Sequence, residues 1–266
     1  MFDETFEQAW RARWGASGPQ GGDPIAGFLR HRSVREYADQ PIAESTVESL
    51  VGAAQSAATS SNLQLWSMVS VQDPERRKAI AHLCADQKQI TDAGWFFAFL
   101  ADHHRLREAA RAAGANPSGL DYQEYYAMAL VDASLAAERM VCAAESIGLG
   151  ICYIGALRND PQGVADLLQL PEGTFGVFGL CLGWPAEGCT AAIKPRLSPS
   201  DVWFRETYGT ADTAEYDARM RAFYEEQGMK GDVTWSMRSG RRVDDHHLTG
   251  REVLKEWLLA RGFGRR

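Results

Sequence analysis

The hydrophobic pattern of the chain is dominated by two short apolar runs, WFFAFLAD at residues 95–102 and FGVFGLCLGW at residues 175–184. Runs of this length without polar alternation are typical of strands that are buried on both faces of a sheet. A further strand is predicted at 65–72, and a short strand or loop at 151–155. The pattern therefore predicts a small sheet with a fully buried centre.

Segments with helical spacing separate these runs. The longest covers residues 121–147, where Met128, Val131, Leu135 and Cys142 share one face and the middle is dense in alanine. Small alanine side chains allow neighbouring elements to approach such a helix closely. Long helices that alternate with a few buried strands predict an α/β or α+β class.

Two shorter helices carry clear start signals, Asp73 followed by Pro74 and Asp160 followed by Pro161. Aspartate at the N-cap accepts hydrogen bonds from the first turn, and proline suits the first helical position. Further helices are predicted at residues 3–14, 44–58, 213–227 and 248–261.

The Gly/Pro-rich stretch GASGPQGGDP at residues 15–24 reads as a linker. We therefore expect residues 1–23 to form an N-terminal helical appendage and residues 24–266 to form one domain. Its turn-rich part, residues 200–266, is expected to be a C-terminal excursion from that domain.

Composition excludes several classes of function. The chain has 266 residues, of which 45% are hydrophobic, so it can bury a sizeable core. A net charge of −7 argues against a nucleic-acid partner. The five cysteines lack C-x-x-C spacing and the histidine pairs are adjacent in sequence, so we expect no metal site. We find no signal-peptide pattern and no apolar run of about 18 residues. We therefore expect a cytoplasmic protein with no membrane partner.

Three polar clusters lie outside the apolar runs: HRSVREY at 31–37, TSSNLQLW at 59–66 and KPRL at 194–197. Arginine offers a planar donor fork that suits phosphate, and lysine offers a point charge. The basic clusters could converge on one phosphate. Each cluster also has an ordinary explanation, as a solvated turn or as a partner for nearby acidic residues. The residue types alone indicate only an α/β protein with a candidate anion site.

Taken in order, these clusters resemble the FMN-dependent nitroreductase family, most closely its oxygen-insensitive NADPH nitroreductases and NADPH–flavin oxidoreductases. The resemblance covers roughly residues 27–200 and rests on HRSVREY, AAQSAATSSNLQLWS, ADQKQI, AESIGLGICYIGALRND, LLQLP, FGLCLGWP and KPRL. It implies a mostly antiparallel central sheet flanked by helices. It also implies an intertwined homodimer with FMN bound at the dimer interface.

The resemblance implies that different residues contact the phosphate and the ring of FMN. His31, Arg32 and Ser33 match positions around the phosphate and ribityl chain, and Lys194 and Arg196 match the second arm of this phosphate clamp. Such a clamp needs several donors that converge on one doubly charged group.

Other matched positions face the flavin ring. Arg35 and Gln87 match contacts to its pyrimidine edge, where a cation such as Arg35 stabilises the negative charge of the reduced flavin. Because the hydride passes through the flavin itself, we expect that no acid–base side chain is needed for the electron transfer. A loop that the partner subunit supplies in this family is matched by Ser60, Ser61, Asn62 and Gln64. The segment that lies against the flavin ring is matched by Tyr153, Ile154 and Gly155.

The implied activity is ping-pong, two-electron hydride transfer from NADPH or NADH through FMN to nitroaromatics, quinones or similar acceptors. A flavin reductase that supplies reduced FMN, and a non-catalytic flavin sensor or storage protein, are the alternatives. NADPH-preferring relatives carry an arginine-rich loop before a D-T-W-S motif. Here Lys230 is the only cation in that loop. Three arginines follow VTWS and either replace the missing ones at the 2′-phosphate or form a solvated basic turn: Arg238, Arg241 and Arg242.

Overall fold

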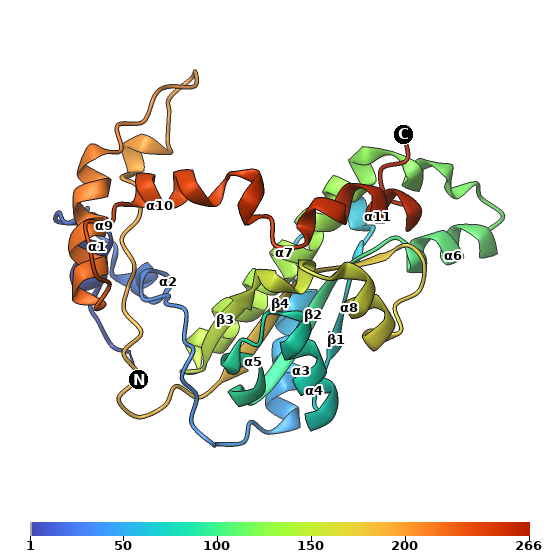
Figure 1. The fold of residues 1–266 in the computed structure, drawn as a ribbon, viewed down its shortest axis with the longest axis horizontal. Coiled ribbons are helices and arrows are strands. Elements are labelled where there is room, and N and C mark those ends of the chain that lie inside the picture. Colours follow the sequence, from blue (N-terminus) through green and yellow to red (C-terminus); the bar gives the residue numbers. More distant parts are fainter. Residues whose placement is uncertain (1) are drawn as a thin grey trace. The chain divides into compact units, whose positions relative to one another are not determined.

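The structure, a computed structural model, describes residues 2–266 and divides into two compact units (Figure 1). Residues 33–190 and 249–266 form the first, which we call the sheet unit. Residues 2–32 and 191–248 form the second, which we call the helical unit. Each unit is therefore built from two stretches that are far apart in the sequence.

The sheet unit is organised around four strands in the order β1-β2-β4-β3, and every neighbouring pair is antiparallel. The two strands predicted from uninterrupted apolar runs, β2 and β4, lie at the centre. The prediction of a mostly antiparallel central sheet is therefore confirmed. The strands are β1 (Trp66–Ser70), β2 (Trp95–Asp102), β3 (Gly150–Ile154) and β4 (Thr174–Gly183).

The two faces of this sheet are covered by different helices. On β2, Phe96 and Leu100 point into a core shared with α4, α5 and α8, whereas Phe97 and Phe99 point into a core shared with α3 and α7. This alternation explains why the run carries no polar position before its last residue, Asp102. The flanking helices are α3 (Glu44–Gln55), α4 (Pro74–Leu83), α5 (Lys88–Asp92), α6 (His104–Ala112), α7 (Gln123–Ser146), α8 (Pro161–Leu168) and α11 (Leu254–Ala260).

Both predicted N-caps are present. Asp73 accepts a hydrogen bond from the backbone N–H of Arg76 at 2.8 Å, and Asp160 accepts one from Gly163 at 2.8 Å. The last helix, in contrast, is shorter than predicted because Gly250 adopts a left-handed conformation and a 3₁₀ turn precedes α11.

The long helix α7 buries a different face from the one that carries Val131 and Leu135. Its alanines, among them Ala133, Ala136 and Ala137, pack against α3 and the sheet. Val131 and Leu135 remain 54% and 43% exposed. Because alanine permits close approach, the alanine face is the one that meets the sheet.

The helical unit has a smaller core of Tyr216, Met220 and Phe223, with Trp235 packed against it. Its helix α10 was not predicted because it is short and polar, although Thr234 caps it by accepting from the N–H of Met237. None of the helices in residues 2–266 is long and apolar enough to span a bilayer. The helices of this unit are α1 (Phe6–Trp14), α2 (Ala26–Leu29), α9 (Ala214–Glu226) and α10 (Trp235–Arg242).

Candidate functional site

The segment from Ser33 to Tyr37 is fixed against the edge of the sheet. The N–H of Val34 donates to the carbonyl of Ile151 at 2.8 Å, and the Tyr37 hydroxyl donates to the carbonyl of Val34 at 2.8 Å. A Cβ atom at Gly150 would lie 2.7 Å from the Val34 side chain, so only glycine allows this close approach. Ser33 and Arg35 are thereby held beside the start of β3.

Arg35 is an exposed cation without a carboxylate partner among residues 2–266. Its Nη1 lies 3.5 Å from the Ser33 carbonyl. Burial raises the pKa of the Cys152 thiol on β3, and the nearby Arg35 guanidinium opposes that shift. An uncompensated positive charge therefore lies beside the strand that leads into Tyr153.

The predicted ring-facing segment is the end of β3 and the turn after it. The Tyr153 hydroxyl donates to Glu138 Oε2 at 3.2 Å, and its ring meets Phe178 edge-on at 5.2 Å. Ile154 is buried, and the carbonyl of Gly155 accepts from Arg251 Nη2 at 3.2 Å. Burial, together with the neighbouring Glu138 carboxylate, raises the pKa of Tyr153, so this hydroxyl stays protonated.

The loop that carries Ser60, Ser61, Asn62 and Gln64 is strained. Ser61, Asn62 and Gln64 have φ angles of 49°, 56° and 51°, in the left-handed region that favours glycine. The strain is offset at the base of the loop, where one carboxylate accepts three hydrogen bonds.

That carboxylate belongs to Asp132 on α7, which is only 1% exposed. It accepts from the Thr59 hydroxyl at 2.6 Å, the Ser60 N–H at 3.2 Å and the Leu65 N–H at 2.9 Å. Asp132 was not predicted from the sequence. A lone aspartate among the alanines of the buried helix face was the available signal.

Gln87 follows a turn in which Ala85 and Asp86 also have positive φ angles. Its side chain donates to the Cys84 carbonyl at 3.0 Å and accepts from Gln89 Nε2 at 2.8 Å. The amide is thus oriented by local contacts, and its role at the flavin edge stays a prediction.

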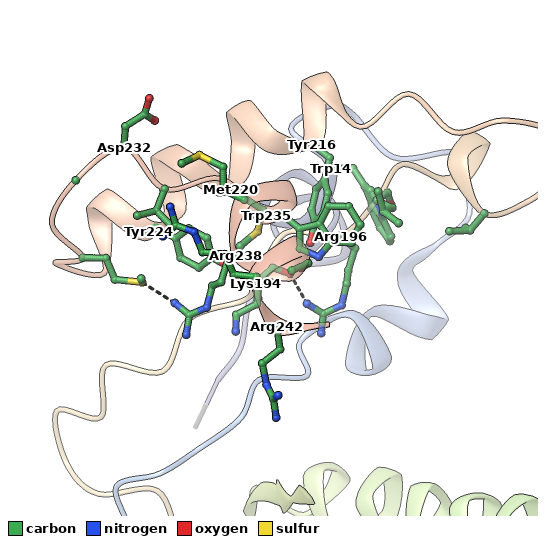
Figure 2. A pocket seen from close by; sticks show the side chains of 18 of the residues that line it. Trp14, Lys194, Arg196, Tyr216, Met220, Tyr224, Asp232, Trp235, Arg238 and Arg242 are labelled. Carbon is green, nitrogen blue, oxygen red and sulfur yellow. Dashed lines mark hydrogen bonds between the residues drawn. The ribbon is translucent and has the colours of Figure 1, made fainter. Parts of the chain in front are cut away.

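In the helical unit, most of the predicted phosphate-binding cations line a single pocket of about 1190 Å³ (Figure 2). Lys194 and Arg196 of the predicted FMN-phosphate arm lie there, together with three arginines predicted for NADPH: Arg238, Arg241 and Arg242. Lys230 is not among the lining residues. Aromatic side chains supply much of the wall: Trp14, Tyr216, Tyr224 and Trp235.

The arginines of this pocket make weak or neutral contacts. Arg196 Nη1 lies 3.3 Å from the carbonyls of Lys194 and Pro195, and Arg238 Nη1 lies 3.4 Å from Met229 Sδ. Within residues 2–266, neither Arg196 nor Arg238 has a carboxylate oxygen within 4.0 Å. A phosphorylated aromatic compound such as FMN fits this combination of arginines without carboxylate partners and aromatic rings.

Arg32 is held differently from these cations. Its Nη2 lies 2.7 Å from Glu4 Oε2, its guanidinium lies 3.8 Å from the centre of the Phe2 ring, and its side chain is buried. Burial is the largest single effect and favours a higher pKa for Glu4, but the hydrogen bond and charge of Arg32, together with a backbone hydrogen bond and the charge of Arg30, lower the pKa of this carboxyl overall. The role of Arg32 at a phosphate therefore stays a prediction, as does that of His31, whose carbonyl accepts from Arg13.

No group of three or more His, Cys, Asp or Glu side chains within the described residues is arranged to hold a metal ion.

Comparison with known proteins identifies the family. The family model described as "Nitroreductase family" matches residues 29–184, and "Nitroreductase family, C-terminal domain" matches residues 194–266. An FMN reductase (NADPH) of Bacillus subtilis is 38% identical over 251 residues, which cover 91% of this chain and 98% of the relative. An oxygen-insensitive NADPH nitroreductase of Salmonella typhimurium is 33% identical over 240 residues, which cover 89% and 96%.

The fold agrees with these matches. The solved structure of the NfrA1 nitroreductase from B. subtilis is similar with a TM-score of 0.84 and 34% identity, and the match covers 91% of this chain and 99% of that one. The resemblance seen in the sequence is thereby confirmed, and the chain belongs to the nitroreductase family.

Proposed function

We propose that this chain is an FMN-dependent NAD(P)H oxidoreductase that reduces electron-poor acceptors such as nitroaromatics or quinones. The observation that carries the proposal is the aromatic pocket of the helical unit, whose arginines lack carboxylate partners within the described residues. Such a pocket suits a phosphorylated ring compound. The names of its relatives, FMN reductase (NADPH) and oxygen-insensitive NADPH nitroreductase, support the same ligand class.

The chemistry that FMN supplies when bound is two-electron transfer, with hydride taken from NAD(P)H and electrons passed to the acceptor in ping-pong order. Lys194 and Arg196 hold the phosphate, where each charge-assisted hydrogen bond is roughly twice as strong as a neutral one. Arg35 places its charge at the redox-active edge. Tyr153 and Gly155 orient the ring and are themselves positioned by Glu138 and Arg251.

The functional unit we propose is a homodimer. The apolar face of α7 that carries Val131 and Leu135 is exposed, and it lines a shallow pocket together with Tyr153 and Phe178. A second copy that covers this face would bury the apolar side chains and bring its own loop, residues 60–64, to the ring-facing segment of the first copy.

The proposed electron donor is NADPH, with its 2′-phosphate bound by Arg238, Arg241 and Arg242. The combined change of Arg238 and Arg242 to Gln should raise KM for NADPH about tenfold while KM for NADH changes little, since a lost charge-assisted contact is worth about that factor. Lys230→Gln provides the matched comparison, because Lys230 lies outside the pocket. Equal changes of KM for both donors would contradict this assignment.

A flavin reductase is the second candidate, because a relative with 38% identity carries the name FMN reductase (NADPH). Steady-state turnover with free FMN, compared with turnover of a nitroaromatic, separates the two. Retained FMN that neither NADPH nor NADH can reduce would favour a non-catalytic flavin protein instead.

The central experiment is anaerobic stopped-flow reduction of the purified protein. The protein should be yellow and should bleach with NADPH or NADH. Arg35→Ala should retain FMN but slow its reduction, whereas Arg196→Ala should weaken FMN retention, because the two cations serve different ends of the cofactor. A colourless protein that cannot be reconstituted with FMN would refute the proposal.

A further inference from the structure

The N-terminal helix α1 lies outside both family-model matches, the first of which begins at residue 29, yet it is built into the helical unit. The helix is well defined at both ends. Thr5 and Gln8 form a capping box, with their side chains and backbone N–H groups paired at 2.8 and 3.2 Å. Gly15 ends the helix in a left-handed conformation with φ of 70°. This segment is therefore an ordered element rather than a loose extension.

One side chain of α1 binds the backbone of both predicted phosphate arms. Arg13 Nε donates to the Leu29 carbonyl at 2.9 Å, Nη2 donates to His31 at 2.8 Å, and Nη1 donates to Lys194 at 3.2 Å. The residue is 5% exposed. The acceptor at His31 begins the first arm, the acceptor at Leu29 lies two residues before it, and the acceptor at Lys194 begins the second arm.

Arginine is suited to this position because its donors form a rigid planar fork. Three carbonyl groups bound to one plane are fixed relative to each other, and so are the side chains that follow them. A lysine ammonium could keep the charge but could not reach all three carbonyls in that arrangement. The contact thus sets the separation between His31 and Lys194.

Two more bonds tie α1 to the second arm. The N–H of Arg196 donates to the Arg13 carbonyl at 3.0 Å, and Trp14 Nε1 donates to the Leu197 carbonyl at 2.9 Å. The segment from Lys194 to Leu197 therefore takes its backbone course from the end of α1.

We propose that Arg13 is a positioning residue of the FMN-phosphate site, through which α1 fixes the arm that begins at His31 relative to the arm at Lys194–Arg196. This inference rests on the proposed function, because it assigns the two arms to the FMN phosphate. Its consequence is selective: loss of Arg13 weakens the hold on the phosphate and leaves contacts to the flavin ring unchanged.

The test compares FMN with riboflavin, which has the same ring but no phosphate. Apoprotein of the full chain is titrated with each flavin, and the quenching of flavin fluorescence gives Kd. In Arg13→Met, Kd for FMN should rise about tenfold, the effect of a weakened charged contact, while Kd for riboflavin should change less than about twofold. Arg11→Met is the matched control, because Arg11 lies on the same helix, is exposed and, among residues 2–266, its side chain pairs only with Glu7 and Ser17.

Two other results would overturn the proposed role of Arg13. An unchanged Kd for FMN in Arg13→Met, or equal weakening of FMN and riboflavin, overturns the positioning role. Trp14→Phe, which keeps a large ring but removes the Nε1–H donor, tests the same idea if Arg13→Met does not fold; it should weaken FMN and spare riboflavin. Wild-type protein that binds neither flavin would refute the proposed function itself, whereas wild-type binding with no change in the variants refutes only the role of Arg13.

Discussion

At the scale of single residues, Asp132 connects the stability of the protein to the shape of a predicted cofactor loop. The loop holds three non-glycine residues at positive φ, each of which costs about 1 kcal/mol or more. The Asp132 carboxylate compensates by accepting three hydrogen bonds in a site that solvent does not reach. Arg105 supports the far side of the loop by donating to the carbonyls of Gln64 and Trp66 at 2.6 Å.

Asp132→Ala should therefore lower the free energy of unfolding by about 3–5 kcal/mol, because it leaves buried donors without an acceptor. Asp132→Asn should cost less, since one acceptor oxygen remains. Urea denaturation of the apoprotein measures both values. Asp166→Ala is the control: within the described chain, the carboxylate of this exposed aspartate accepts only from Gln162, and its loss should change stability by less than about 0.5 kcal/mol. If Asp132→Ala lowers the free energy of unfolding by less than about 1 kcal/mol, the loop keeps its conformation without the Asp132 hydrogen bonds.

The candidate site could be predicted from the sequence where its residues cluster along the chain. Arg35, Lys194 and Arg196 stand in short basic motifs, so their chemistry was visible without coordinates. Arg13 and Asp132 were not predicted, because each acts on backbone groups that lie far away in the sequence. The lone aspartate among the alanines of α7 marks Asp132 as unusual, but spacing along the chain does not show which backbone groups it binds.

At the scale of elements, α7 presents two faces with different tasks. Its alanines pack against the sheet and α3, while Val131 and Leu135 remain exposed beside Tyr153. We expect the exposed face to bind a second copy of the chain. Burying a leucine side chain contributes about 2 kcal/mol, so a charge at this position should prevent association.

Leu135→Glu should convert the protein to a monomer that no longer retains FMN, measured by light scattering after size exclusion and by flavin absorbance. Val253→Glu is the matched control, because Val253 is similarly exposed, at 49%, but belongs to the C-terminal segment. It should remain dimeric and yellow. A Leu135→Glu variant that stays dimeric would place the interface elsewhere on the chain.

Elements with strong local signals were predicted well, and weak ones were missed. The strands β2 and β4 and the helices capped by Asp73 and Asp160 follow directly from apolar runs and N-cap residues. The helices α6 and α10 are short, rich in arginine and have no buried residue, so no extended apolar stripe marks them. Tertiary contacts, rather than local pattern, determine where these helices lie.

At the scale of the whole chain, distant segments complete each unit. In the sheet unit, the C-terminal residues return to the start of α7, where the N–H of Gln123 donates to the Arg266 carbonyl at 3.1 Å and the N–H of Arg266 donates to Asp121 at 3.0 Å. His103 lies at this junction, fully buried, with its ring 4.5 Å from the Phe263 ring. The sequence could not predict this closure, because it joins positions that are separated by most of the unit.

The junction should make folding stability depend on pH. His103 Nε2 donates to the Tyr125 carbonyl at 3.0 Å, while Nδ1 has no hydrogen-bond partner within the described residues. Burial lowers the pKa of His103 from its ordinary value of 6.5. Arg107 acts in the same direction, and the Tyr125 carbonyl, Asp102 and Asp121 act against it. The unfolded chain therefore takes up the proton first, so the stabilisation is complete above about pH 6.5 and is lost as the pH falls below that value.

Urea denaturation at pH 7.5, 6.5 and 5.5 measures this effect, which amounts to at most about 1.4 kcal/mol per pH unit for one proton. His103→Gln keeps a donor for the Tyr125 carbonyl but cannot titrate, so its stability should fall less steeply below pH 6.5 than that of the wild type. His82→Gln, at an exposed position beside Asp86, should keep the wild-type slope. If His103→Gln and the wild type lose stability in parallel, the acid sensitivity of the fold arises from other groups.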